Sequence, residues 1–231
     1  MKKIFSLVCL LTISCTLLHA ATKERFRVPD FDKIKQESLD GNSKFNFEKL
    51  YNRFAENDTT MTGREYQTLY FGYMFQEDYD PFRDVEVPKD IAELQTRIGK
   101  LSKKEARRVA DFCKRALADD PFDLLQRHYY AQVMEQIGKH NTAVVQFAHL
   151  RKLVHAICST GDGSQENPWY VISADNEYAL LNMLNYTAID HNTEANETID
   201  IITVMDHKEQ TKRIYFNVAK PLEIEQVKFA E

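Results

Sequence analysis

The sequence predicts a mainly α-helical α+β fold: repeat-like antiparallel helix pairs with a small C-terminal cap made of a short strand, a helix and a β-hairpin. Two long amphipathic segments lie between Leu101 and Ile157 and are joined at residues 119–121. After Cys158 the pattern changes to a polar loop followed by short β-prone runs. The chain has only 7 glycines and 6 prolines beside 11 tyrosines and 14 phenylalanines, which favours packed aromatic helices over long linkers. We expect a helical body over residues 21–157 and an α/β cap over residues 158–231 packed on it.

Residues 1–20 have the layout of a secretory signal peptide. Lys2 and Lys3 precede an apolar run over residues 4–18, and small residues follow at Ala20 and Ala21. The run is too short to span a membrane stably. We predict cleavage after Ala20 and a periplasmic or extracellular protein without a membrane span. An alternative takes residues 12–15 as a lipoprotein box with a lipid anchor on Cys15; it is disfavoured because the apolar run continues past that cysteine.

Charge and cysteine content exclude two further classes of protein. Loss of the two signal lysines leaves 28 basic residues against 35 acidic ones, a formal charge of −7 without a basic block, so we expect no nucleic-acid partner. Cleavage also leaves only Cys113 and Cys158, too few for a disulfide scaffold. In the repeat register described below they lie roughly 16 Å apart along the helix axis. That separation exceeds the reach of a disulfide, so we predict that they do not pair.

Capping signals predict where the helices begin. Single capping residues are expected at Asp30, Asn46 and Asp90. Capping boxes are expected at Thr62 with Glu65 and at Ser102 with Glu105. The helix that begins at Gly63 carries Tyr66, Tyr70 and Tyr73 on one side. These rings could stack on a sugar, but their helical spacing favours core packing.

The segment from Leu124 resembles a helix-turn-helix repeat of the tetratricopeptide type when it is read with a period of 34 residues. Gly138, Ala143 and Phe147 then occupy the positions of the turn glycine, the small contact residue and the gap-filling aromatic residue. The match is partial, since Arg127 and Met134 stand where the repeat has tryptophan and tyrosine. We expect helices over about 103–118, 121–137 and 142–157, the second capped by Asp120.

The C-terminal cap is predicted from shorter signals. A β-prone run over residues 170–172 precedes a helix capped by Ser173 or Asp175, with Tyr178 and Leu181 on its apolar side. A polar loop continues to Glu197. Residues 198–205 and 213–219 then form a predicted hairpin, to which residues 170–173 can add a third strand.

Two long stretches carry a family resemblance. FEKLYNRFAENDTTMTGREYQTLYFGYMFQEDYDPF from Phe47 to Phe82 and STGDGSQENPWYVISADNEYALLNMLNY from Ser159 to Tyr186, together with YFN at residues 215–217, resemble a family of exported Bacteroidetes proteins of unknown function. The resemblance implies a shared fold and an envelope location, and it assigns no active site. Asp58, Thr59 and Thr60 resemble the sequon at which such exported proteins are O-glycosylated, so Thr59 is a candidate modification site.

Three groups of residues could carry chemistry, and each has a simpler structural reading. Oxygen-rich residues around Asp162 could hold calcium, but they lack the order of an EF-hand loop and suit a plain turn. His155 and Cys158 could supply two zinc ligands or a thiolate with its base, yet no further metal motif accompanies them. Glu177 and Tyr178 could act as acid and base, although adjacent helical residues point about 100° apart. We expect Tyr178 in the core and Glu177 as a helix-start carboxylate favoured by the helix dipole.

The sequence thus predicts no catalytic residue, no metal site and no cofactor. The preferred interpretation is a non-enzymatic interaction or scaffold module of the cell envelope that binds a protein or peptide. Its partner-binding face would consist of residues in the first helix of the repeat, within residues 124–138: Arg127, His128, Tyr130, Gln132, Met134 and Glu135. The alternative is an envelope hydrolase whose active site is assembled from distant carboxylates.

Overall fold

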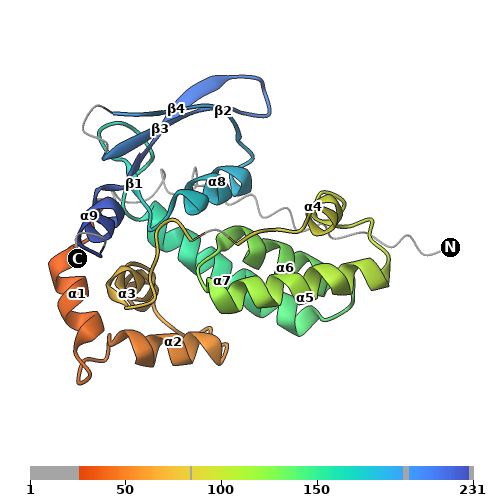
Figure 1. The fold of residues 1–231 in the computed structure, drawn as a ribbon, viewed down its shortest axis with the longest axis horizontal. Helices are drawn as coiled ribbons and strands as arrows, with labels where there is room; N and C mark the ends of the chain where they lie inside the picture. Colours follow the sequence, from red (N-terminus) through yellow and green to blue (C-terminus); the bar gives the residue numbers. More distant parts are fainter. Residues whose placement is uncertain (1–25, 84, 195–197, 229–231) are drawn as a thin grey trace, which may run out of the picture.

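The computed structural model describes residues 26–83, 85–194 and 198–228, so the predicted signal peptide and Cys15 lie outside the described residues. Helices make up most of the described chain, and a small sheet lies at one end of the molecule (Figure 1). The predicted α+β class, mainly helical with a C-terminal sheet, is confirmed. Within the described ranges, no helix combines the length and the apolar character that crossing a bilayer requires.

Local capping signals start the N-terminal helices where they were predicted. Asp30 caps α1 (Phe31–Leu39) and Asn46 caps α2 (Phe47–Ala55), each accepting a hydrogen bond from a backbone N–H of the first turn. Thr62 and Glu65 form the predicted capping box at the start of α3 (Gly63–Gly72), which continues into the short 3-10 helix η2 (Tyr73–Phe75). These bonds satisfy N–H groups that a helix start leaves without partners.

The middle helices lie side by side and form the body of the molecule (Figure 1). They are α4 (Lys89–Gln95), α5 (Lys103–Asp119), α6 (Leu124–Gln136) and α7 (His140–Cys158). Gly138 has φ +81° in the turn between α6 and α7, a conformation that glycine adopts without strain. Ala143 is buried where the helices meet, so both residues have the steric roles predicted for them.

Two predicted helix starts are wrong. The helix predicted over residues 121–137, α6, begins at Leu124 with Asp123 as its cap. The link before it places the Phe122 ring in the main core. Asp120 instead accepts a hydrogen bond from the Phe122 N–H in that link. Helix α4 begins at Lys89 after Pro88, and Asp90 lies in its first turn rather than at its cap.

The sheet contains one strand more than was predicted. Among the described residues, its order is β1 (Trp169–Tyr170), β4 (Thr211–Asn217), β3 (Ile199–Met205) and β2 (Thr187–Thr193). The β3–β4 hairpin is confirmed, and β1 joins it in parallel. Strand β2 occupies residues that were predicted as a loop, and the unpredicted helix α9 (Ala219–Lys228) follows β4.

One hydrophobic core runs through both the helical body and the C-terminal part. Buried side chains from α2, α3, α7, α8 (Ala174–Met183) and the sheet belong to the same cluster, among them Phe54, Tyr70, Ile157 and Phe216. A second cluster fills the space between α4, α5, α6 and α7, and Phe147 packs against both. Helix α8 lies between the sheet and the helical body (Figure 1), which positions the candidate site.

Candidate metal centre

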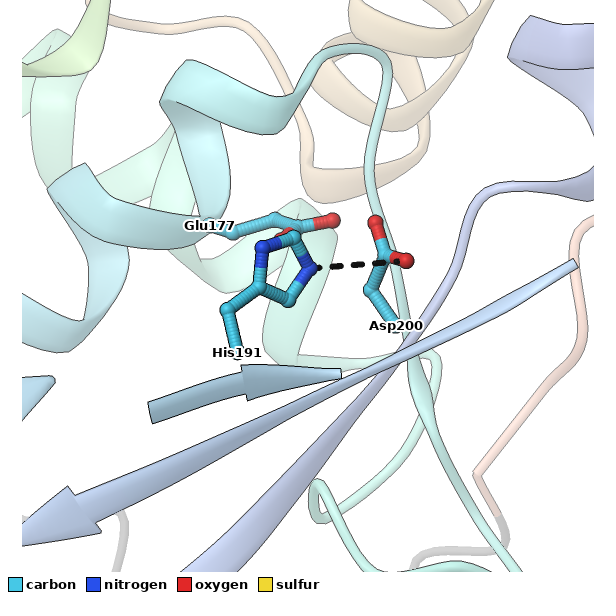
Figure 2. Close-up of side chains that lie close together, drawn as sticks. All are labelled: Glu177, His191 and Asp200. Atoms are coloured by element: carbon cyan, nitrogen blue, oxygen red, sulfur yellow. Dashed lines mark ion pairs between the residues drawn. The ribbon is translucent and has the colours of Figure 1, made fainter. Parts of the chain in front are cut away.

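Three metal-ligating side chains meet between α8 and the sheet. Glu177 comes from α8, His191 from β2 and Asp200 from β3, and Figure 2 shows them directed toward one another. One potential ligand atom from each residue lies within 4.8 Å of the other two. The Nε2 atom of His191 is 3.5 Å from Oδ1 of Asp200. Within the ranges that the structure describes, this is the one group of three such side chains close enough to share a cation.

The register of the hairpin brings His191 and Asp200 to the same face. Thr193 pairs with Asp200 and His191 pairs with Ile202 across the antiparallel strands. Paired residues and residues two apart share one face of a sheet, and here that face includes the buried side chain of Ile202. Thr193 Oγ1 donates a 2.8 Å hydrogen bond to Oδ1 of Asp200, which fixes the orientation of the carboxylate.

A buried amide holds the start of α8 in place. Asn176 accepts a 2.5 Å hydrogen bond from the Tyr70 hydroxyl through Oδ1 and donates one of 3.1 Å to the carbonyl oxygen of Phe122 through Nδ2. Both bonds are buried, so they tie the first turn of α8 to α3 and to the link before α6. The next residue, Glu177, is thereby held between the helical body and the sheet.

Glu177 is a carboxyl group in the protein interior, where a negative charge is costly. Its side chain is 0% exposed, and apart from the neighbouring Asp200 carboxyl group neither of its oxygens has a hydrogen-bond partner. Desolvation raises the pKa of Glu177 to about 9, and the negative charge of Asp200 contributes to the increase. The arrangement can therefore hold a proton between two carboxyl groups or bind a cation that compensates both charges.

A pocket of about 300 Å³ lies next to the cluster and shares Asp200 with it, and Thr193, which donates to Asp200, also lines the pocket. The rest of its wall is mainly apolar and comes from the loop before α4, the start of α8 and the β4–α9 junction: Pro81, Phe82, Ser173, Ala174, Val218, Pro221 and Leu222. Phe82 is 57% exposed at this pocket. The cluster is thus positioned beside a space of ligand size.

The predicted roles of Glu177 and Tyr178 are reversed in the structure. Tyr178 is 42% exposed, whereas Glu177 is in the interior. Helix α8 is covered on two sides, by the sheet and by the helical body, so its buried side is broad and includes Asn176, Leu180 and Leu181 as well. Tyr178 falls outside this buried side, and its hydroxyl lies 3.3 Å from Nδ1 of His191.

The residues predicted to bind a partner differ in accessibility. Arg127 is 5% exposed and Met134 is also buried, which corrects the expectation that they are presented on an open face. Arg127 Nη1 donates to Gln146 Oε1 at 2.6 Å and Nη2 to the carbonyl oxygen of Pro121 at 2.6 Å. The others are half-buried or exposed on α6: His128, Tyr130, Gln132 and Glu135. A partner for these four stays a prediction.

The remaining candidates have structural roles or stay untested. Asp162 Oδ1 accepts a hydrogen bond from the Ser164 N–H, as in a plain turn. The neighbouring Gly161 is required because a Cβ there would collide with the carbonyl oxygens of Asn167 and Pro168. His155 is exposed and Cys158 packs against the main core.

The structure also locates the three tyrosines of α3 and η2 and the candidate glycosylation site. Tyr66, Tyr70 and Tyr73 are buried, which confirms the core interpretation. Thr59 lies half-buried in a turn after α2, and its carbonyl oxygen accepts a 3.0 Å hydrogen bond from Lys152 Nζ. Its glycosylation stays a prediction.

Comparisons with known proteins identify a matching family for the chain. Neither the curated proteins nor the solved structures with which the chain was compared include a match. A family profile described as "Domain of unknown function (DUF4919)" matches residues 32–227, which covers α1 through most of α9 and includes all three side chains of the cluster. The chain therefore belongs to this family of domains of unknown function.

Proposed function

We propose that this is an exported protein that binds a divalent transition-metal ion through Glu177, His191 and Asp200. The observation that carries the proposal is the complete burial of Glu177, whose carboxyl group has no hydrogen-bond partner other than Asp200, opposite an imidazole. A buried polar group without a partner is costly, and a buried charge more so. A divalent cation would supply the missing partner and balance the charges of the two carboxylates.

The mixed ligand set favours a particular class of metal. Calcium and magnesium prefer sites made of oxygen ligands alone, whereas an imidazole with carboxylates suits zinc and its first-row neighbours. Bonds of about 2.0–2.2 Å to zinc place neighbouring ligand atoms roughly 3–3.5 Å apart. The His191–Asp200 distance of 3.5 Å is already of this size, and Glu177 needs a modest side-chain movement to complete the set.

Titration of zinc into chelator-treated protein, followed by calorimetry, tests the proposal. We expect one zinc ion per chain and a higher melting temperature. Glu177→Gln removes one of three ligands and should weaken zinc binding at least about 10-fold. The matched control is Asp190→Asn, because Asp190 lies on β2 next to His191 but outside the cluster, and its Oδ2 accepts a hydrogen bond from Asn192.

The outcome that would overturn the proposal is equal zinc binding by the wild type and Glu177→Gln. Weaker zinc binding by Glu177→Gln supports the proposal only if the variant still folds. We expect metal-free Glu177→Gln to be at least as stable as the metal-free wild type, since the amide cannot carry a charge in the buried position. A comparison of melting temperatures without metal checks this.

Export is supported by the layout of residues 1–20. The intact mass of the product should correspond to a chain that begins at Ala21. A diacylglycerol adduct on Cys15 would contradict a protein without a lipid anchor. The same mass spectrum would show a glycan on Thr59, and its site can be tested with Thr59→Ala.

Hydrolysis is a second candidate function, favoured by the position of the cluster beside a pocket. Catalytic zinc sites commonly use three protein ligands and leave a position for water, as these residues would. The zinc-loaded protein should then cleave small esters, and Glu177→Gln should lower the cleavage in parallel with its weaker zinc binding. The non-enzymatic interaction role rests on the half-exposed residues of α6, and it is tested separately by partner capture with His128→Ala and Gln132→Ala.

A further inference from the structure

We infer that the pocket beside Asp200 binds a small carboxylic acid anion with a short hydrocarbon tail, whose carboxylate completes the coordination of the metal. This inference rests on the proposed metal site. It adds the chemical class of the ligand, which metal binding alone does not determine.

The first step is the shared wall between the pocket and the cluster. Asp200 belongs to both, and Thr193, which donates to its carboxylate, also lines the pocket. A ligand that occupies the pocket therefore ends beside a side chain that holds the metal. Three protein ligands leave at least one coordination position for such a ligand.

The second step is the chemistry of the tail. Apart from Asp200, Thr193 and Ser173, the pocket wall consists of proline, phenylalanine, valine, leucine and alanine side chains. Phe82 keeps 57% of its surface exposed there, so a ligand that covers its ring gains from burying apolar area. A volume of about 300 Å³ is at the small end of ligand pockets, which favours a small molecule over a polymer.

The third step is the charge of the head group. With a divalent cation bound, the charges of Glu177 and Asp200 are balanced, and an anion can approach. The N-cap residue Ser173 and the first residue of α8, Ala174, lie in the pocket wall, and the Ser173 side chain makes no capping hydrogen bond to the helix. The positive end of this ten-residue helix therefore also favours an anionic group. Without the metal, Asp200 repels the same anion.

Three small molecules measure the contributions of the charged head group and of the hydrocarbon tail separately. Hexanoate has both features, hexanamide has the tail without the charge, and acetate has the charge without the tail. We expect zinc-loaded protein to bind hexanoate at least about 10-fold more tightly than either of the others, and metal-free protein to lose this preference. Calorimetry or ligand-observed NMR measures the three affinities.

Variants of α9 locate the binding in this pocket. Leu222→Trp fills the pocket and should lower hexanoate affinity at least about 10-fold while zinc affinity stays unchanged. Val227→Trp is the matched control, because Val227 is 67% exposed on the same helix and outside the pocket wall. If Leu222→Trp does not fold, Phe82→Ala removes an exposed ring instead and should also weaken hexanoate binding.

Each outcome has a distinct meaning. Zinc binding with equal affinity for hexanoate and acetate would overturn the ligand inference and leave the metal site standing. Equal hexanoate binding with and without zinc would overturn the link between ligand and metal. Failure to bind zinc would overturn the proposed function and the inference with it.

Discussion

The hydroxyl of Tyr178 lies 3.3 Å from Nδ1 of His191, and the two rings meet edge to face with an interplanar angle of 88°. The contact joins α8 to the exposed edge strand β2. It leaves Nε2 of His191 directed at Asp200. A hydrogen bond to the nitrogen that does not bind the metal commonly orients a histidine ligand.

Tyr178→Phe should therefore weaken zinc binding by about 10-fold without loss of folding, since the imidazole loses its orienting partner. Competition with a chromophoric zinc chelator measures the affinity. Tyr186→Phe serves as the control, because Tyr186 precedes β2 and its ring packs under Lys212 Nζ instead of contacting the cluster. If the two variants bind zinc equally, Tyr178 has no part in orienting His191.

The sequence predicted much of the fold because its strongest signals are local. A capping box needs only four residues, and both predicted boxes, at Thr62–Glu65 and Ser102–Glu105, form as expected. The predicted start of α6 was wrong because either Asp120 or Asp123 can act as the N-cap of this helix. Burial of Phe122 in the core, a contact between distant segments, selects the second.

The candidate site escaped prediction because it depends on strand β2. Residues 187–193 read TAIDHNT, all of them exposed, so no alternation of apolar and polar side chains marks the strand. A bulge between Ala188 and Asp190 interrupts the period further. Pairing with β3 produces the strand, and only that register places His191 beside Asp200. The pairing of Thr193 with Asp200 is a contact that co-varying positions in an alignment could have indicated.

The second prediction concerns pH. His149 is buried, its Nδ1 lies 2.6 Å from the Tyr66 hydroxyl, and Nε2 has no hydrogen-bond partner. Desolvation lowers the pKa of His149 to about 4, with the charge of Arg127 contributing. In the unfolded chain the histidine takes up a proton near pH 6.5. Stability from the neutral imidazole is thus complete above pH 6.5 and declines as the pH falls toward 4.

Urea unfolding at pH 7.5 and pH 4.5 measures this dependence. The loss attributable to His149 should be on the order of 2 kcal/mol. Comparison with His149→Gln isolates it from Asp123, whose pKa is raised to about 6 by burial and which acts in the opposite direction. His155→Gln, an exposed change on the same helix, serves as the control for replacing a histidine by glutamine. An equal pH dependence in wild type and His149→Gln would contradict the assignment.

The third prediction concerns the thiols. No disulfide joins Cys113 to Cys158. In a chain that begins at Ala21, thiol titration after denaturation without reductant should count two groups. Burial raises the pKa of Cys113 to about 12, so this thiol should react only slowly in the folded protein. A count of zero after denaturation would mean that the two cysteines pair and that the helix positions are incorrect.

The fourth prediction concerns Arg127, which supports the interior of the helical body. Its guanidinium lies 4.7 Å from the ring centre of Phe54 and donates to Gln146 and to the Pro121 carbonyl oxygen. Desolvation lowers its pKa to about 10, so the group stays charged near pH 7. Arg127→Ala leaves these acceptors without their donor and opens a cavity beside Phe54. We expect it to lower the free energy of unfolding by about 3–5 kcal/mol.

Urea denaturation of three variants decides between an interior and a surface role for Arg127. Arg127→Met keeps most of the buried volume and should cost less than Arg127→Ala. Arg151→Ala removes an exposed arginine from α7 and should change stability by less than about 0.5 kcal/mol. If Arg127→Ala behaves like Arg151→Ala, the buried position of Arg127 is wrong and a partner-binding role becomes the better explanation. If it unfolds the protein as expected, lost partner capture by an Arg127 variant reports on folding, and only His128, Tyr130, Gln132 and Glu135 can test the binding face.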